Sequence, residues 1–372
     1  MSQKTKCLLW GGYGWGNVGD ELTLAAAIRD MKARYGDACA ILSPVPGYTM
    51  ALFPGEHVVP YKALIGSEPS APRRSIAQRG WFKARRSLGY SDPVLPPRSI
   101  HERIAANPLP EWIDYLRGAE MLYLVGGGYL TDLFSLDQFL TPVEMASHLG
   151  IAIETAPLGI GPFISPESLQ RFGAALAKAR VRTRDADSLT LCKQVGINAE
   201  MYPDDGFRAS EDLNVSDITR RKVIGINYFE QHGAKDRTKS RQWWRDLVVG
   251  LNQQGVEVEG FCFHNQISSD FSKTVELLVE CGIAPHRVCP PDLDYRDACR
   301  RIASYQGIVT CRFHATVVAN VLGVPAIATA DGSYYTSKMQ VAIAGAKSAR
   351  VIDPGVNAVD EALSEILGRF NS

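Results

Sequence analysis

Short apolar runs alternate with longer amphipathic segments along almost the whole chain. Apolar runs bounded by turn residues suit strands that are buried on both faces, and the longer segments suit amphipathic helices. Their alternation is typical of a parallel β-sheet whose strands are joined by crossover helices. In the first half the pattern predicts strands at residues 7–10, 38–42, 57–61, 121–128, 151–159 and 179–184, and helices at 20–36, 136–150 and 165–179.

The alternation restarts after a polar connector at about residues 205–218. Two such units predict an α/β fold of two Rossmann-like domains facing across a cleft, at 1–210 and 211–372, with the last helix a candidate to pack back on the first domain. In sheets of this type ligands bind beyond the carboxyl ends of the strands. In the second unit we expect strands at 222–229, 256–264, 307–311, 324–329 and 349–353, and helices at 241–255, 271–282, 294–304 and 315–323.

The composition fits an ordinary globular protein. With 372 residues, of which 45% are hydrophobic and 22% charged, the chain can build two cores. The formal net charge is zero, so no overall positive field points to a nucleic acid partner. The eight cysteines are scattered without a CxxC pair, which predicts neither a zinc site nor a disulfide framework.

Secretion and membrane insertion are not predicted. The first apolar run is too short for a signal peptide, and no stretch approaches the ~18 apolar residues of a membrane span, so we expect a cytoplasmic protein. One insertion, at about residues 64–108, breaks the alternation, and its part 71–103 carries eight basic residues. This part is either a surface loop or a surface for anionic lipid or a pyrophosphate-linked acceptor, which would bring peripheral membrane contact.

The stretch GGYGWGNVGD at residues 11–20 follows the first predicted strand and contains the pattern GxGxxG. That pattern can bind a dinucleotide, but it then requires an acidic residue at the end of the second strand. The second predicted strand ends at Ser43 instead, which disfavours an NAD-dependent oxidoreductase. The remaining interpretation is a helix N-terminus whose amides bind an anion or a hydroxyl-rich ligand, with candidates Gly16, Asn17, Gly19 and Asp20.

A structural role for part of this loop stays open, because Asp20 and Glu21 also complement the dipole of the following helix. A second glycine cluster, which includes Gly127 and Gly128, follows the apolar run that begins at residue 121. Glycines allow a backbone to approach a ligand closely. Two such loops at strand ends favour a ligand site in the cleft.

Six segments occur in the order and rough spacing found in one protein family. They run from about residue 7 to residue 330 and read GGYGWGNVGDE, VGGGYLTD, LGIGP, RTRDADSLTLCKQVGI, DDGF and CRFHATVVANVLGVPAIA. In these segments the chain resembles the polysaccharide pyruvyl transferases. The resemblance implies a fold like the two-domain GT-B glycosyltransferases. It also implies transfer of pyruvate from phosphoenolpyruvate to two sugar hydroxyls, forming a cyclic ketal in a polysaccharide or glycolipid precursor.

The resemblance also implies roles for single residues. The family's Arg-Leu-His motif falls on Arg312 and His314, with Phe313 in place of leucine, and its Arg-Asp-x-x-Ser motif falls on Arg184 and Ser188. In the family the arginines are associated with binding the donor's carboxylate and phosphate. The histidine is associated with acid catalysis.

The chemistry of phosphoenolpyruvate suits these residue types. Arginine forks bind carboxylate and phosphate groups through charge-assisted contacts. Histidine, whose ordinary pKa is near 6.5, can protonate the methylene carbon, so His314 is the candidate acid. Asp20 could accept a proton from the attacking hydroxyl or orient it. Lys338, in the altered segment ADGSYYTSKM, is a further substrate-binding candidate, and we expect neither a metal nor a redox cofactor.

Alternatives to this assignment stay open. A glycosyltransferase of the same fold would bind a nucleotide sugar in the second domain, and a non-catalytic carbohydrate-binding protein could use the same glycine loops and arginines. His314 could be a buried histidine at a strand–helix junction. His264 could line the cleft or form a polar turn. Trp243 and Trp244 are expected to pack a helix against the sheet, although one of them could stack on a sugar ring.

Overall fold

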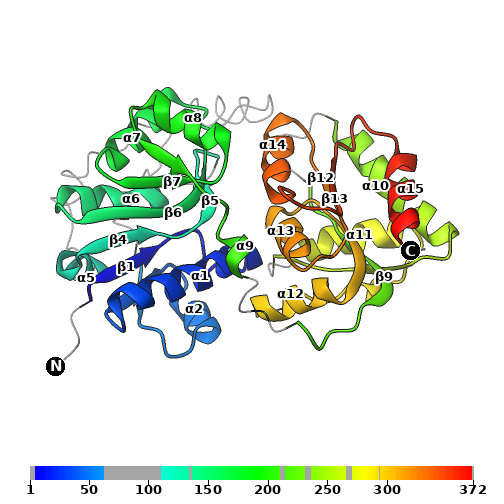
Figure 1. Ribbon diagram of the computed structural model, residues 1–372, viewed down its shortest axis with the longest axis horizontal. Helices are drawn as coiled ribbons and strands as arrows, with labels where there is room; N and C mark the ends of the chain where they lie inside the picture. Colours follow the sequence, from blue (N-terminus) through cyan, green and yellow to red (C-terminus); the bar gives the residue numbers. More distant parts are fainter. Residues whose placement is uncertain are drawn as a thin grey trace, which may run out of the picture.

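The computed structural model describes residues 5–62, 110–133, 136–209, 213, 215–230, 236–264, 270–292 and 294–370. Two parallel β-sheets with helices on both faces form two units side by side (Figure 1). The first sheet has the order β3-β2-β1-β4-β6-β7-β8, and β5 pairs with β6 beside this path. Its strands are β1 (Cys7–Trp10), β2 (Cys39–Ser43), β3 (Val58–Pro60), β4 (Met121–Leu124), β5 (Gly127–Leu130), β6 (Ala152–Ile160), β7 (Arg180–Thr183) and β8 (Ala199–Met201).

Both faces of the first sheet are covered because its central strands are apolar throughout. In β1, Leu9 belongs to the core under α1, whereas Leu8 and Trp10 belong to the core under α5 and α6. Ser165 caps α7 by accepting from the Ser168 amide at 3.2 Å, as helix starts prefer. The helices of this unit are α1 (Val18–Tyr35), α2 (Pro46–Leu52), α5 (Trp112–Gly118), α6 (Leu136–His148), α7 (Pro166–Leu176), α8 (Ala186–Gln194) and α9 (Gly206–Ala209).

The second unit repeats the arrangement with the strand order β10-β9-β11-β12-β13. Its strands are β9 (Arg221–Asn227), β10 (Glu257–Gly260), β11 (Tyr305–Thr310), β12 (Ala326–Thr329) and β13 (Ala349–Ile352). Its α-helices are α10 (Arg237–Gln253), α11 (Ser272–Glu280), α12 (Tyr295–Ala303), α13 (Phe313–Val321), α14 (Ser333–Ala342) and α15 (Val359–Phe370).

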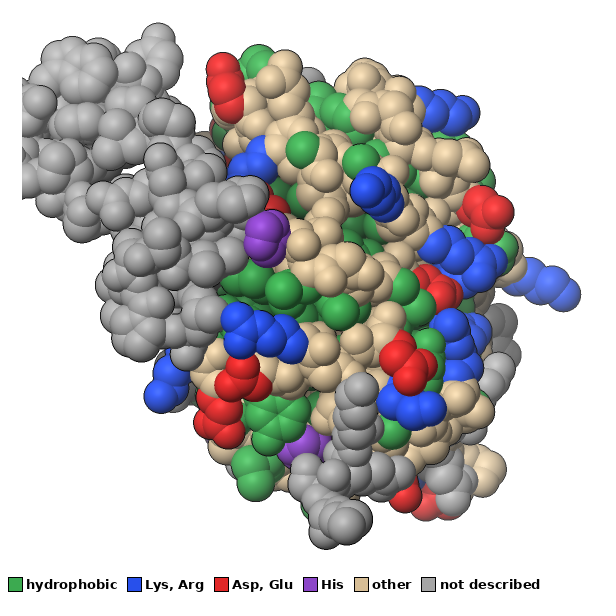
Figure 2. Space-filling view, turned by 90° about the vertical axis from the view of Figure 1, so that its left-hand side faces the viewer, with side chains coloured by type: hydrophobic (Ala, Val, Ile, Leu, Met, Phe, Trp, Pro, Cys, Tyr) green, Lys and Arg blue, Asp and Glu red, His purple; other side chains and the backbone are tan. Residues whose placement is uncertain are grey.

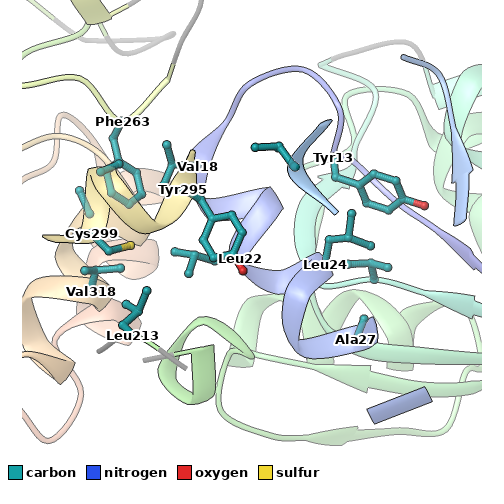
Figure 3. Packing of buried hydrophobic residues seen from close by; sticks show 14 of the residues in the cluster. Tyr13, Val18, Leu22, Leu24, Ala27, Leu213, Phe263, Tyr295, Cys299 and Val318 are labelled. Carbon is teal, nitrogen blue, oxygen red and sulfur yellow. The ribbon is translucent and has the colours of Figure 1, made fainter. Parts of the chain in front are cut away.

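An apolar interface joins the two units. The N-terminal half of α1 packs against α12 and α13, and Figure 3 shows Val18 and Leu22 together with Tyr295 and Val318 of the second unit. The Val18 amide also donates to the Phe263 carbonyl across the interface at 3.2 Å. The first turns of α1 are therefore fixed relative to the second sheet.

The order of the strands places the two candidate loops at special points. In the first sheet the chain leaves β1 toward β2 and later returns on the other side through β4, so the crevice beyond β1 and β4 is a topological switch point. In the second sheet the same reversal occurs between β9 and β11. Ligands of open α/β sheets bind at such points. The two glycine loops follow β1 and β4, so both lie at the switch point of the first sheet.

The predicted α/β class with two Rossmann-like units is confirmed, and most predicted elements occur within a few residues of their expected bounds. Two strands were predicted too long. The strand expected at 121–128 is divided into β4, which ends at Leu124, and β5, which begins at Gly127. Gly127 has φ 143°, and β5 pairs with β6. The strand expected at 256–264 ends at Gly260.

The last helix also differs from the expectation. α15 packs against α10 of its own unit, where Leu363 contacts the backbone at Gly250, and it does not return to the first unit. The basic segment 71–103 lies outside the described residues. On the end face of the first unit in Figure 2, described acidic and basic side chains are interspersed. Among the helices that the structure describes, none is long and apolar enough to cross a membrane.

Candidate functional site

The glycine loop of residues 11–17 ends in a tightly organised helix start. Gly14 and Gly16 have φ values of 89° and 78°, which favour glycine. Asn17 caps α1 by accepting from the Gly19 amide at 3.3 Å, and its Nδ2 donates to Asp20 Oδ2 at 2.7 Å. The loop therefore presents Asp20 in a fixed orientation at the first turn of α1.

Position 19 must be a glycine because His314 of the second unit lies against its backbone. A Cβ atom added to Gly19 would lie 2.0 Å from Nδ1 of His314, so the imidazole rests directly on the backbone of α1. His314 is buried in the first turn of α13, and Gly206 of α9 approaches its other side. The helix N-terminus of one unit thus meets the catalytic candidate of the other.

Arg184 and His314 share a buried carboxylate that the sequence did not single out. Asp204, which is fully buried after β8, accepts from Arg184 Nη1 at 2.7 Å and lies 3.4 Å from His314 Nε2. Although burial opposes ionisation, these two partners hold the pKa of Asp204 below its ordinary value. The Nε of Arg184 is buried without a hydrogen-bond partner and lies 3.9 Å from the Asp185 carboxylate.

Phe313 contributes an aromatic face to the same site. The guanidinium of Arg184 lies 4.3 Å from its ring centroid and the Lys338 ammonium lies 5.6 Å from it, both within cation–π distance. A leucine, the usual residue of the family motif, offers no such face. Opposite the ring, Gly128 and Gly159 leave room for Arg184, because a Cβ at either position would approach its Nη2 to 3.1 Å or 2.6 Å.

Asp20 and Lys338 bring opposite charges to the same place. Burial raises the pKa of Asp20 above its ordinary value, while His314, Lys338 and Arg184 act in the opposite direction. Burial, together with the two arginines 184 and 312, lowers the pKa of Lys338 to about 8. A Cβ at Gly127 would lie 3.3 Å from Asp20 Oδ1, so the second glycine cluster forms the wall beside this carboxylate.

Arg312 lies at the second switch point and is held by its own carboxylate. Its Nε donates to Asp270 at 3.0 Å, and its guanidinium stacks 4.2 Å from the ring centroid of Phe229. Asp270 is fully buried and also accepts from Asn227 Nδ2 at 2.9 Å. Burial opposes its ionisation, but Arg312 and Asn227 hold the pKa of Asp270 below its ordinary value.

The structure thus brings together most of the predicted site residues, from both units. Ser188 differs, because its buried hydroxyl accepts from the Ile160 amide at 2.8 Å and so supports β6 behind Arg184. His264 pairs with Asn17 in a short antiparallel bridge, and burial and Arg312 lower the pKa of His264 to about 4. The residues that meet between the two units are Asp20, Gly19, Gly127, Gly128, Arg184, His314 and Lys338, with Arg312 beyond them.

Two carboxylates of the site were missed from the sequence. Asp204 is the first residue of DDGF, one of the segments that carry the family resemblance. Its place in that segment, just before the polar connector, could have indicated a role in the site. Asp270 had no sequence signal, because it precedes α11 in an ordinary helical pattern. Trp243 and Trp244 are buried in the core of the second unit, as predicted for packing residues.

The site offers no arrangement typical of a metal or a dinucleotide. Within the described ranges, no group of three His, Cys, Asp or Glu side chains is placed to hold a metal ion. At the end of β2, where a ribose-binding carboxylate would stand, the Ser43 hydroxyl is 2.7 Å from Thr49 Oγ1.

Solved structures with a similar fold include several UDP-N-acetylglucosamine 2-epimerases. A putative UDP-N-acetylglucosamine 2-epimerase from Listeria monocytogenes has a TM-score of 0.57 and 10% identity, covering 100% of this chain and 89% of that one. The UDP-GlcNAc 2-epimerase of Methanocaldococcus jannaschii has a TM-score of 0.55 and 11% identity, covering 98% and 92%. At such identities the similarity shows a GT-B-like fold alone.

The family comparison is more specific. A comparison with curated proteins found no match. The model of the family described as polysaccharide pyruvyl transferase matches residues 17–333, a range that contains Asn17, Arg184, Asp204 and His314. Because this match spans most of the chain and both halves of the site, the protein is a member of the polysaccharide pyruvyl transferase family.

Proposed function

We propose that this protein transfers pyruvate from phosphoenolpyruvate to two hydroxyls of one sugar, forming a cyclic ketal. The observation that carries the proposal is the convergence of Arg184, Lys338, His314 and Asp20, from four separate parts of the chain, at one place between the units. Two cations and an acid–base pair are what a carboxylate, a phosphate and a reacting enol need.

The reaction requires one proton at carbon and the release of phosphate. Protonation of the methylene carbon by His314 makes the neighbouring carbon electrophilic, and a sugar hydroxyl attacks it while Asp20 takes the hydroxyl proton. The bond between that carbon and the phosphate oxygen then breaks, and the second hydroxyl closes the ring. Of the two hydroxyl protons, one restores the acid and one leaves with inorganic phosphate, so the atoms balance.

Each arginine of the site is held in place by a buried carboxylate. Arg184 pairs with Asp204 and Arg312 pairs with Asp270, so an incoming trianion meets cations whose positions are already fixed. Fixed donors lose little freedom when a ligand binds. The guanidinium of Arg184 and the ammonium of Lys338, both beside the Phe313 ring, are the groups we assign to the donor.

Ligand-induced stabilisation tests the donor. A ligand at 100 times its Kd adds about 2.7 kcal/mol to the unfolding free energy. We expect phosphoenolpyruvate to stabilise the wild type and to lose this effect in Arg184→Met. A matched control is Arg221→Met, which removes an arginine from the amino end of β9 and leaves the site intact. Stabilisation by UDP-GlcNAc alone would contradict the proposal and favour a glycosyltransferase.

The acid role of His314 is tested separately. General acid catalysis contributes roughly 10²- to 10⁴-fold, so His314→Gln should lower phosphate release by that factor once an acceptor is supplied. Binding of phosphoenolpyruvate should persist in this variant. Unchanged turnover would remove the catalytic assignment.

A further inference from the structure

Asn227 ends β9 at the switch point of the second sheet, and its side chain is fully buried. Its Oδ1 accepts from the Thr310 hydroxyl at 2.9 Å, and its Nδ2 donates to the Asp270 carboxylate at 2.9 Å and to the Phe261 carbonyl at 3.0 Å. The Arg312 amide donates to the same Thr310 hydroxyl at 3.0 Å. Both polar atoms of the Asn227 side chain are therefore engaged, and a buried network that is satisfied in this way holds one conformation.

Asp270 divides its two carboxylate oxygens between Arg312 and the backbone that follows β10. Oδ1 accepts from Arg312 Nε at 3.0 Å, whereas Oδ2 accepts from Asn227 Nδ2 and from the Phe263 amide, each at 2.9 Å. Arg312 lies close enough to Lys338 for its charge to lower the pKa of that ammonium. A shift of the Asp270 carboxylate would therefore move Arg312 relative to the groups assigned to the donor.

The backbone that follows β10 continues this network into the first unit. The Phe263 carbonyl accepts from the Val18 amide at 3.2 Å, and His264 forms a short antiparallel bridge with Asn17. Figure 3 shows Phe263 and Val18 in the cluster between the two units. Asn17 in turn donates to Asp20 at 2.7 Å. The buried network of the second sheet thus reaches the candidate base of the first unit.

We propose that Asn227 is a positioning residue, which fixes Arg312 and the glycine loop of residues 11–17 relative to each other through Asp270. The inference rests on the proposed pyruvyl transfer and adds to it a residue that acts without touching the substrates. Because the side chain of Asn227 is uncharged, its removal changes the positions of the charged groups and not their number. Removal of Asp270 would also take away a counter-charge of Arg312, so Asn227 gives the cleaner test.

Hydrogen–deuterium exchange tests the link between the units. Asn227→Leu has a similar size but no amide. We expect it to speed the exchange of the backbone amides of residues 14–20 about tenfold, because the carboxylate that holds the Phe263 amide loses one of its partners. Asn320→Leu is the matched control, because Asn320 of α13 also ties two segments of the second unit by donating to the Ala342 and Ala344 carbonyls. It should leave the exchange of residues 14–20 unchanged.

Calorimetric titration with phosphoenolpyruvate tests the position of Arg312. Asn227→Leu should lower the affinity about tenfold, and Asn320→Leu should not change it. Thr310→Val covers the case that Asn227→Leu does not fold, because it removes the hydroxyl that orients the Asn227 amide and should act in the same direction. Thr310→Ser keeps a hydroxyl and should behave like the wild type in both measurements.

The two measurements separate this inference from the proposed function. Equal exchange of residues 14–20 in the wild type and Asn227→Leu would overturn the link between the units. An affinity for phosphoenolpyruvate that Asn227→Leu leaves unchanged, or that Asn320→Leu lowers as much, would overturn the positioning of Arg312. Faster exchange in Asn227→Leu together with a wild type that does not bind phosphoenolpyruvate would support the link and overturn the donor.

Discussion

The interface between the two units has an apolar region and a polar region, and they differ in what they do. In the apolar region Val18 and Leu22 of α1 are buried among side chains of α12 and α13 (Figure 3). In the polar region, in the same turn of α1, Gly19 lies against His314, and Asp20 interacts electrostatically with His314 and Arg184. The same helix therefore holds the units together and presents the reacting groups.

The difference teaches how charged groups can be kept at an interface. Burying ions costs free energy that their mutual attraction recovers only with good geometry. The apolar region supplies non-directional stabilisation, so the polar region need not contribute any. We expect substitutions in the two regions to separate stability from ligand binding, and the tests below run from the largest expected effect to the smallest.

The largest effect is expected in the polar region, at Asp204. Asp204→Asn removes the 2.7 Å ion pair of Arg184, whose side chain is 3% exposed, and leaves only Asp185 at 3.9 Å; breaking such a buried pair costs about 3–5 kcal/mol. Urea unfolding at neutral pH measures this loss, and phosphoenolpyruvate should restore more stability to the variant than to the wild type. Asp217→Asn, which breaks an exposed pair with Arg300, is the control and should change little. A loss as small as the control's would contradict the role of Asp204.

In the apolar region Leu22→Ala should cost about 2–5 kcal/mol, because Leu22 is fully buried. Leu42→Ala removes an equally buried leucine from the core of the first unit, and its cost should be similar. The two variants should differ in their affinity for phosphoenolpyruvate. Only Leu22→Ala should lower this affinity, because it alone loosens the contact between α1 and His314. Calorimetric titration measures this, and equal affinities would show that the apolar region does not position the site.

Glu21 lies between the two regions and provides a pH test. It is 1% exposed, its Oε1 accepts from the Gly14 amide at 2.8 Å, and burial raises its pKa from 4.5 to about 8. A folded-state pKa above the unfolded one means that the contribution of this carboxyl is present below pH 4.5 and is lost as pH rises through 8.

Glu21→Gln, which cannot ionise, should therefore be more stable than the wild type at about pH 9. The expected gain is a few kcal/mol, because each pH unit between the unfolded pKa of 4.5 and the folded pKa of about 8 costs the wild type up to about 1.4 kcal/mol. At about pH 5 the two proteins should unfold at similar urea concentrations. A constant difference between them at both pH values would contradict burial of an ionisable Glu21.

The smallest effect concerns Lys338. Because its pKa is about 8, the ammonium is charged at pH 7 and mostly neutral at pH 9, and the donor should bind about tenfold more weakly at the higher pH. Titration of phosphoenolpyruvate across this range measures the change. Lys338→Met should bind weakly and show no such slope, and a slope that persists in the variant would assign the titration to another group.

Much of the fold followed from the sequence because buried parallel strands and amphipathic helices have different periods. The strands β1 and β6 and the helices α1 and α12 lie close to their predicted bounds. The helices α2, α5, α8, α9 and α14 were not predicted, and the last helix, α15, packs on α10 and not on the first unit as expected. Helix contacts of this kind depend on which surfaces remain uncovered after the sheet has formed, and no local pattern encodes that.

The sequence by itself determined the two α/β units, the glycine loops and the residues Arg184, Arg312 and His314, because these follow from local patterns and motif resemblance. Only the tertiary structure decided that Gly19 supports the imidazole of His314, that Asp204 joins Arg184 to His314, and that Ser188 serves the backbone instead. These contacts join residues that are distant along the chain, some within the first unit and some between the units, and no local pattern encodes which of them meet once the chain has folded.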